Sequence, residues 1–382
     1  VLVENGDDGD SFNYSPPRKD MEVFSNESKC TVKISGSDIY DQAEIHFDMV
    51  VPADLDERAE GKVSVTMLVD MTVALRKDSK VIDFNVKVDN KGLSHRLCVL
   101  FDSQIVSAFN YADQQFGLIK RPNYYEKEMK LYMESMNNKT EKKAGIQELA
   151  NWANDQSTWQ EPPISIEPTQ SYVSLTDGKT GIAVIPQGVR EYEVLDDSKI
   201  RLTLFRTYGF MGKENLIYRP GRASGERIIE TPAAQLLKEM EFNFGFTSYA
   251  GDINDSDIDT LAKQYNTNLE VYTYAEFLNG RLIFSQREIE GQNAKIHSLF
   301  ETEGNLVVSA VKKAEEDDGY IIRLYNGKDH KDLDDKIKFN FDIKEAYYTN
   351  LKEEKTEEIK VENNTISVKE LSHCKFVTIW VK

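Results

Sequence analysis

The chain has 382 residues, of which 40% are hydrophobic and 29% charged, and these values predict a globular protein of two or three domains. The formal net charge is −18, from 65 acidic and 47 basic residues. A field of this sign repels phosphate backbones and anionic lipid surfaces, so we expect neither nucleic acid nor a membrane as a partner.

The three cysteines are odd in number and far apart, which is not the pattern of a disulfide framework or a metal knuckle; they are Cys30, Cys98 and Cys374. We therefore expect a reducing, cytoplasmic location. No run approaches the roughly 20 apolar residues of a membrane span. The first residues, VLVENGDDGDSF, lack the basic and apolar regions of a signal peptide. The absence of an initiator Met indicates a fragment or a processed product.

Strand patterns dominate the first hundred residues. The clearest is residues 62–75, KVSVTMLVDMTVAL, in which seven apolar residues share one parity. Such a period of two predicts a strand with one face packed on a core and the other largely exposed to solvent. Further strands are predicted at 31–34, 43–51, 81–88 and 95–101, with polar turns between them. This spacing favours an antiparallel sandwich over alternating strands and helices.

The middle of the chain interrupts the strands. Residues 124–155 are rich in Glu, Lys and Met, which predicts one or two short helices and favours a structural excursion over a functional lid. Strands resume at 171–175, 181–186 and 200–205, and residues 209–230 are predicted to be a long ordered loop. A short helix is predicted at 255–264, with Asp255 or Ser256 as its cap. Residues 306–382 alternate again and predict a separate terminal sandwich.

Metal-ligand patterns are weak. Two of the five histidines lie in His-x-Asp pairs, at His46–Asp48 and His330–Asp332. A zinc site needs several such groups from different elements, so a solvated strand face and a polar turn are the favoured interpretations. Residues 252–256 imitate the start of a calcium loop, but the required Gly and Glu are missing, so we interpret them as a helix cap. No metal site is expected in this chain.

Two segments carry candidate binding residues. Asp7, Asp8 and Asp10 form an acidic turn, for which binding of a cation or a sugar hydroxyl is the alternative. The second segment, RTYGFMGKENLIYRPGRASGE at 206–226, concentrates basic residues, tyrosines and glycines in an acidic chain. Guanidinium and phenol groups suit sugar hydroxyls or a carboxylate. For Arg219 and Arg222 a purely structural bracing role is an equal alternative. Paired catalytic carboxylates cannot be identified by sequence alone.

These segments carry a family resemblance. The run RLTLFRTYGFMGKENLIYRPGRASGE followed by TPAAQ is similar to the C-terminal region of bacterial family 38 glycoside hydrolases. Four further segments match in the same order: DDGDSFNYSPP, SHRLCVLFD, FGLIKRP and DGKTGIAVIPQGVREYEV. The terminal GNLVVSAVKKAEEDDGYIIRLYN resembles the last domain of those enzymes. The resemblance spans nearly the whole chain.

The resemblance implies a fold and a domain division. The expected fold is all-β with minor α, a large antiparallel supersandwich like that of galactose mutarotase plus a smaller C-terminal β-sandwich. Residues 1–20 would be an opening segment that contacts the missing catalytic half. Residues 21–290 would be the supersandwich, with the helical excursion at 124–155, and residues 291–382 the C-terminal sandwich.

The resemblance also implies a parent α-mannosidase that acts with retention and uses zinc or another divalent metal. Its nucleophile and metal ligands belong to an N-terminal domain, so no catalytic residue is expected in this chain, which would scaffold that domain and be inactive alone. The expected partners are this domain, an α-mannoside and, as a further possibility, a second copy of the enzyme. The alternative is a stand-alone carbohydrate-binding or structural β-module.

Family members place a Tyr and an Arg of this region at the sugar. Arg206 matches the Arg by position, and Tyr14 or Asp10 matches the opening segment. Tyr218 and Arg222 are further substrate-binding candidates. Replacing Arg206 by Ala in the complete enzyme is expected to reduce turnover with little change in melting temperature.

Overall fold

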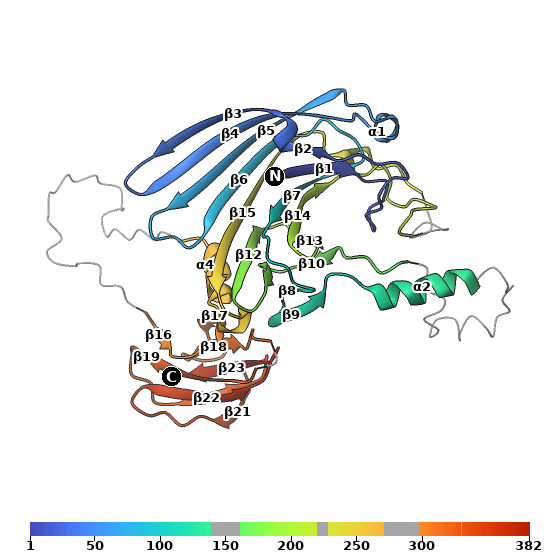
Figure 1. The fold of residues 1–382 in the computed structure, drawn as a ribbon. Coiled ribbons are helices and arrows are strands. Elements are labelled where there is room, and N and C mark those ends of the chain that lie inside the picture. The colour runs from blue at the N-terminus through green and yellow to red at the C-terminus, as the bar shows by residue number, and fades with distance from the viewer. Residues whose placement is uncertain (139–160, 220–227, 271–297, 330) are drawn as a thin grey trace, which may run out of the picture. The chain divides into compact units, whose positions relative to one another are not determined.

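The computed structural model of the chain describes residues 1–138, 161–219, 228–270, 298–329 and 331–382 (Figure 1). Contacts divide it into two compact units, residues 1–114 with 119–258 and residues 115–118 with 259–382. The strands of both units pair in antiparallel sheets, so the predicted all-β class with a large and a smaller sandwich is confirmed. The expected boundary at 290/291 lies outside the described residues. In the part of the chain that is described, no helix combines the length and apolarity that crossing a membrane requires.

The first unit is built from two sheets. The strand order of the smaller sheet is β10 (Glu167–Pro168), β13 (Glu191–Leu195), β14 (Lys199–Arg206), β7 (His95–Asp102), β1 (Leu2–Gly6) and β2 (Val23–Phe24). The order of the larger sheet is β3 (Lys29–Gly36), β4 (Tyr40–Val51), β5 (Val65–Arg76), β6 (Ile82–Asp89), β15 (Glu239–Ala250), β12 (Thr180–Gln187), β11 (Val173–Thr176), β8 (Phe109–Gln114) and β9 (Gly117–Pro122).

The core of this unit lies between the two sheets, because one apolar cluster contains inward side chains from both. In β5 the buried residues are Met67, Val69 and Met71, while Leu68 and Asp70 between them are exposed. The predicted alternation of residues 62–75 is therefore confirmed in the middle of the strand. Leu75, predicted for the packed face, is exposed where β5 approaches the end of the sheet.

The start of the chain is part of this sandwich. Within residues 1–20, which the sequence predicts to be an opening segment contacting the missing catalytic half, Leu2–Gly6 form the fully buried strand β1 between β7 and β2. Leu2 belongs to the core cluster, and each residue of β1 has a partner on β7. Only the residues after Gly6 leave the sheet as a loop.

Three helices are described, and sequence reasoning missed the first. Helix α1 (Leu55–Glu60) begins because the Asp54 side chain accepts hydrogen bonds from the Asp56 and Glu57 N–H groups, both at 3.0 Å. It ends at Gly61, whose φ of 71° is the left-handed conformation that suits glycine. The helix buries Arg58.

The two predicted helical regions are present where the structure describes them. Helix α2 (Glu126–Asn138) occupies the start of the predicted excursion, whose residues 139–155 lie outside the described residues. Helix α4 (Ile258–Tyr265) starts three residues later than predicted, and Ser256 Oγ accepts a hydrogen bond from Ile258 N–H at 3.4 Å. Asp252 caps the short 3₁₀ turn before it, as predicted.

The second unit is a small sandwich of its own. One sheet has the order β16 (Phe300–Thr302), β19 (Leu333–Phe339), β22 (Thr365–Leu371). The other has the order β17 (Val307–Lys313), β18 (Tyr320–Tyr325), β23 (Phe376–Val381), β20 (Ala346–Thr349), β21 (Lys355–Glu358). Strand β19 alternates strictly between buried and exposed residues, and its inward apolar residues, Leu333, Ile337 and Phe339, pack in a separate apolar cluster. The terminal sandwich predicted from residues 306–382 is confirmed.

Candidate functional site

Two segments that are about 200 positions apart in the chain meet at one end of the first unit. The loop after β1 supplies three carboxylates, and the last residue of β14 and the loop after it supply three cations. The ion pairs are Asp7–Arg206, Asp8–Lys213 and Asp10–Arg219. We call these six side chains the clasp. Four of the five candidate substrate-binding residues lie in the clasp or beside it, namely Asp10, Arg206, Tyr14 and Tyr218. The fifth candidate, Arg222, lies outside the described residues.

The pair Asp7–Arg206 is bidentate. Arg206 Nε lies 2.7 Å from Asp7 Oδ2, and Nη2 lies 3.2 Å from Oδ1. Nη2 also donates to the Asp10 carbonyl at 3.1 Å. Asp7 is fully buried, and this burial raises the pKa of its carboxyl against the opposing effect of Arg206. Removing Arg206 would leave a buried carboxylate unpaired, so the expectation that Arg206→Ala spares the melting temperature must be revised.

Asp10 is the centre of the clasp. Its Oδ1 accepts hydrogen bonds from the Phe12 and Asn13 N–H groups at 2.9 and 3.0 Å, and its Oδ2 accepts one from Lys213 N–H at 2.9 Å. Both oxygens also contact Arg219. Burial alone would raise the pKa of Asp10, but Arg219 and these N–H groups lower it. The carboxylate is buried with its oxygens occupied, so Asp10 orders the loop rather than facing solvent.

Arg219 braces the loop structurally, which is one of the two roles that the sequence left open for this residue. It is buried, and its guanidinium also contacts Asn13 Oδ1 and donates to the Lys213 carbonyl at 3.0 Å. These bonds tie together both loops of the clasp. For Arg222 the two alternatives stay open.

Tyr14 is also held inside the loop. Only 7% of it is exposed, and the guanidinium carbon of Arg96 lies 4.0 Å from the centre of its ring. Its hydroxyl accepts a hydrogen bond from Asn5 Nδ2 at 3.0 Å, and burial raises the pKa of that hydroxyl. The Tyr218 ring meets it edge to face, with centroids 6.0 Å apart. The two rings therefore pack the two loops against each other.

Phe12 is the residue of this region that sequence reasoning missed. It is 60% exposed, although the Asp10 carboxylate fixes the turn that carries it. Ser11, the residue before Phe12, donates through Oγ to the Met211 carbonyl at 2.6 Å. The loop after β14 therefore also holds this turn. Because the turn holds this aromatic ring in one place, Phe12 is a candidate binding contact. In the sequence DDGDSFNYSPP, nothing distinguishes Phe12 from the buried Tyr14 two positions later.

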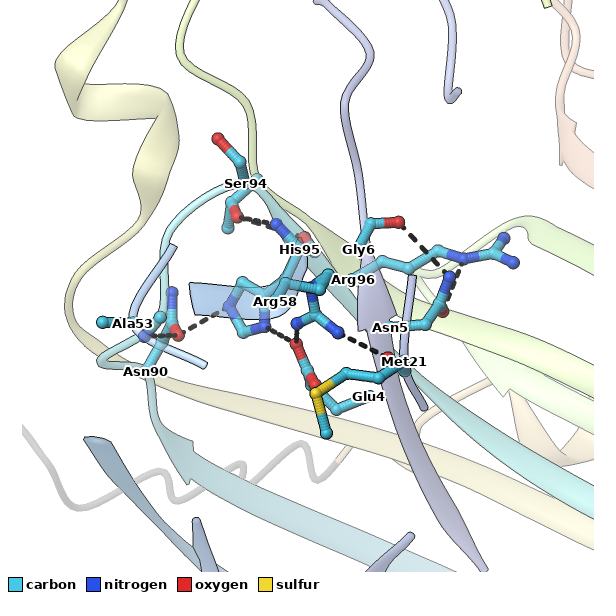
Figure 2. Close-up of polar contacts among 12 residues, drawn as sticks. Glu4, Asn5, Gly6, Met21, Ala53, Arg58, Asn90, Ser94, His95 and Arg96 are labelled. Atoms are coloured by element: carbon cyan, nitrogen blue, oxygen red, sulfur yellow. Dashed lines mark hydrogen bonds and ion pairs between the residues drawn. The ribbon is translucent and has the colours of Figure 1, made fainter. Parts of the chain in front are cut away.

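A buried polar network lies under the clasp (Figure 2). Glu4 Oε1 accepts from Arg58 Nη2 and lies 2.9 Å from His95 Nδ1. Arg58 Nη1 donates to the Met21 carbonyl at 2.6 Å. Figure 2 shows Glu4 facing Arg58 and His95, while its neighbour Asn5 turns to the other side of β1. The side chains of Glu4, Arg58 and His95 are at most 1% exposed, so this is a fully buried charged group.

The amide of Asn90 fixes one proton of this network. Its Nδ2 donates to the Gln235 and Leu236 carbonyls at 3.0 and 3.2 Å, and its Oδ1 accepts from Gly92 N–H at 3.1 Å. The oxygen is therefore the atom that faces His95 Nε2, at 2.9 Å. It follows that Nε2 of His95 carries a hydrogen and donates it.

The network is connected to both clasp segments through His95, the first residue of β7, and Ser94 before it. Asp7 N–H donates to the Ser94 carbonyl at 2.9 Å. Thr207, next to Arg206, donates its N–H to the His95 carbonyl at 2.7 Å and accepts from His95 N–H through Oγ1 at 2.9 Å. The buried group therefore fixes the places from which both loops depart.

The His-x-Asp pair at His46 lies away from this region, on the solvent-facing side of the larger sheet. His46 Nδ1 lies 2.7 Å from Asp70 Oδ1, and Nε2 lies 3.3 Å from Asp48 Oδ1. The hydrogen bond to Asp70 raises the pKa of His46. The prediction of a solvated strand face is confirmed here, whereas His330 of the other pair lies outside the described residues. Among the residues that are described, no group of three or more His, Cys, Asp or Glu side chains is arranged to hold a metal ion.

Comparison with known families identifies the family to which this fold belongs. The model of the glycosyl hydrolases family 38 C-terminal domain matches residues 2–210, which is more than half of the chain. The chain belongs to glycoside hydrolase family 38. A second model, of the family 38 C-terminal beta sandwich domain, matches residues 305–378. The resemblance stated from the sequence motifs is thus confirmed, and the chain is a C-terminal region of this family.

Individual relatives are longer than this chain. A protein of Halalkalibacterium halodurans named "Putative mannosylglycerate hydrolase" is 23% identical over 389 aligned residues, which cover 97% of this chain and 37% of the relative. A solved structure described as an alpha-mannosidase from Enterococcus faecalis V583 covers all of this chain with a TM-score of 0.72 and 19% identity. This chain covers 38% of it. A second Enterococcus faecalis structure, described as a protein in the glycosyl hydrolase family 38, gives the same TM-score and identity. These identities support a shared fold, and the chain spans about two fifths of its relatives.

Proposed function

We propose that this chain is the C-terminal scaffold of a retaining α-mannosidase-type glycoside hydrolase, and that its clasped loops form part of the rim of the sugar pocket. Membership of family 38 supports a glycosidase as the parent enzyme. The description of one solved structure as an alpha-mannosidase supports the choice of substrate class. The relatives are longer than this chain, which fits a nucleophile and metal ligands in another domain.

The observation that carries the rim proposal is the exposure of Phe12 on a turn that the clasp immobilises. A sugar presents C–H groups on one face and hydroxyl groups at its edges. A fixed aromatic ring offers an apolar surface to such a face, and rigid placement reduces the entropy lost on binding. The proposed stacking partner is therefore Phe12, which is preorganised by Asp10.

Arg206 and Tyr218 complete the proposed rim. Arg206 is 16% exposed, and its bonds to Asp7 and Asp10 use Nε and Nη2. Within the described residues its Nη1 has no bonding partner, which leaves two N–H donors for a sugar hydroxyl. Tyr218 is half-buried beside Tyr14. Because Asp10 and Tyr14 are buried, we assign them the positioning of this rim rather than direct contact with the sugar.

The test uses the complete enzyme and hydrolysis of p-nitrophenyl α-mannoside. Phe12→Ala should lower kcat/KM about two- to thirteenfold, because an aromatic contact of this kind contributes about 0.5–1.5 kcal/mol. The matched control is Phe109→Ala, which removes an equally large exposed ring from β8, away from the clasp. Equal activity of both variants would contradict the rim proposal.

The same assay separates the scaffold from the stand-alone module. The chain alone, with added zinc, should show no turnover, and clear hydrolysis would refute the scaffold proposal. A reading frame that continues upstream of Val1 into a catalytic domain supports the enzyme, whereas a start codon at Val1 supports the module.

Two further proposals concern the parent enzyme. We propose zinc or another divalent metal in its catalytic domain, which membership of family 38 supports. We also propose a cytoplasmic location, supported by three free cysteines, two of which are exposed.

A further inference from the structure

Strand β3 forms an edge of the larger sheet, and no described strand lies on its outer side (Figure 1). Ser37 N–H, just past β3, donates to the Tyr40 carbonyl at 2.8 Å and so points toward β4. Backbone groups alternate in direction along a strand. The N–H and C=O groups of Cys30, Val32 and Ile34 therefore point outward, away from β4.

The side chains of the same three residues extend the apolar face of the sheet. The β3–β4 register places Cys30 beside Phe47, Val32 beside Ile45 and Ile34 beside Ala43, and Phe47 belongs to the core. Val32 is nevertheless 57% exposed and Ile34 81% exposed. An edge strand with open backbone groups and exposed apolar side chains is a template for pairing with another strand.

We propose that a second copy of this chain occupies this edge, with the two β3 strands pairing antiparallel about a two-fold axis at Val32. The outward-facing residues then meet in hydrogen-bonded pairs, Val32 with its own copy and Ile34 with Cys30 of the partner subunit. On the opposite face of the sheet, Lys33 meets Thr31 of the partner subunit and Lys29 meets Ser35 of the partner subunit. Apolar side chains meet apolar ones, and each lysine meets a hydroxyl group.

Charge and strand length select this register. A two-fold axis at Lys33 would set this lysine against its own copy, and an axis at Thr31 would set Lys33 against Lys29 of the partner subunit. Like charges directly opposite each other destabilise a sheet. An axis at Ile34 would pair Val32 with Gly36 of the partner subunit and leave Cys30 without a strand partner. The axis at Val32 pairs residues 29–35, nearly the whole of the eight-residue strand.

The interface is self-complementary, which is the requirement for a two-fold dimer. The net charge of −18 on each chain opposes association at long range, while the strand itself carries the positive residues Lys29 and Lys33. Salt at about 0.15 M screens charges more than about 8 Å apart but leaves the backbone pairing unaffected. We therefore expect the dimer to be tighter at this ionic strength than in dilute buffer.

Cross-linking tests the register. In a chain with Cys30→Ser and Cys374→Ser, the variant Val32→Cys places two thiols directly opposite each other. Hydrogen-bonded pairs have Cα atoms about 5.5 Å apart, within the range of a disulfide. The control Thr31→Cys is also exposed, but it faces Lys33, so its own copy lies beyond about 7 Å. Mild oxidation should give a covalent dimer of Val32→Cys only; equal yields for both variants would overturn the proposal.

The molar mass by sedimentation equilibrium tests the dimer itself. The unmodified chain should have the mass of two copies, and Val32→Lys should weaken the dimer at least tenfold by setting lysine against lysine. The control Ile39→Lys changes an exposed residue of the turn beyond β3 and should leave the dimer intact. A monomer at every concentration, or a dimer that tolerates Val32→Lys, would overturn the proposal.

The complete enzyme distinguishes a second copy from another domain as the occupant of this edge. If Val32→Cys in that enzyme neither cross-links nor reacts with a thiol reagent, another part of the enzyme covers the edge and the proposal fails. All these readouts are mass or cross-linking, so they are independent of whether the clasp binds a sugar.

Discussion

The buried network at Glu4 makes Arg58→Ala a sharp test of how the clasp is supported. The substitution removes the guanidinium that binds Glu4 and the Met21 carbonyl. Glu4 then keeps only His95 as a partner for a fully buried carboxylate, whose Oε2 already has no hydrogen-bond partner. Breaking a buried ion pair by removal of one member costs about 3–5 kcal/mol. The first unit is therefore expected to lose a large part of a typical stability of about 5–15 kcal/mol.

Differential scanning calorimetry is the suitable assay, because the chain has two units that need not unfold together. For a unit of about 250 residues, each kcal/mol shifts Tm by about 2–4 °C, so Arg58→Ala should lower the first unit's Tm by about 6–20 °C. The matched control is Arg76→Ala, since Arg76 is exposed and lies 3.7 Å from Asp83 in a surface ion pair. That control should cost less than about 1 kcal/mol.

A double-mutant cycle then isolates the ion pair from lost packing. Glu4→Gln removes the charge that Arg58 neutralises, so combining it with Arg58→Ala should cost less than the sum of the two single changes. The expected coupling is about 0.5–3 kcal/mol. The reasoning is refuted if Arg58→Ala melts no lower than Arg76→Ala, or if the two changes are additive.

Four further substitutions, at three residues, test the clasp and the second unit. Because the folded-state pKa of Asp10 is lowered, the stability that it contributes is present above about pH 4 and is lost as the pH falls below that value; the Tm gap between the unmodified chain and Asp10→Asn should therefore narrow from pH 6 to pH 3. Arg206→Ala should cost about 3–5 kcal/mol by leaving Asp7 unpaired, and Arg206→Lys should cost less because it keeps the charge, as urea titration would measure. Asp335 is buried and accepts the Gly304 N–H at 2.6 Å, so Asp335→Ala should lower the calorimetric transition of the second unit and leave that of the first unchanged.

The sandwich could be predicted from the sequence because strand alternation is a local signal. The period of two in residues 62–75 specifies which side chains face the core, whatever the rest of the chain does. The alternation does not predict how far along the strand the opposite sheet covers these side chains. Leu75, Val32 and Ile34 fit the pattern of core residues, but they are exposed near the end of the larger sheet. Sheet coverage is a tertiary property, and the local pattern cannot contain it.

The candidate site was predictable only in part, for a related reason. The two loops could be recognised by their composition, and four of the five candidate residues do come together. Their roles depend on partners about 200 positions away, such as Arg219 for Asp10, and no local pattern encodes that pairing. The short helix α1 lacked an apolar period, although Asp54 and Gly61 mark its ends. Its buried Arg58 could therefore not be distinguished from a surface arginine.

The pairing within the clasp also limits the kind of ligand that the described loops can recognise. Three carboxylates oppose three cations, so the basic residues that first suggested an anion site are mostly neutralised by Asp7, Asp8 and Asp10. Two of the three pairs have side chains that are less than about a fifth exposed, where added salt screens little. The clasp leaves accessible the Phe12 ring, the remaining donors of Arg206 and part of the Asp8–Lys213 pair, whose side chains are 29% and 30% exposed. The neutral sugar ring proposed as the ligand fits such a surface, because each cation of the clasp is paired with a carboxylate.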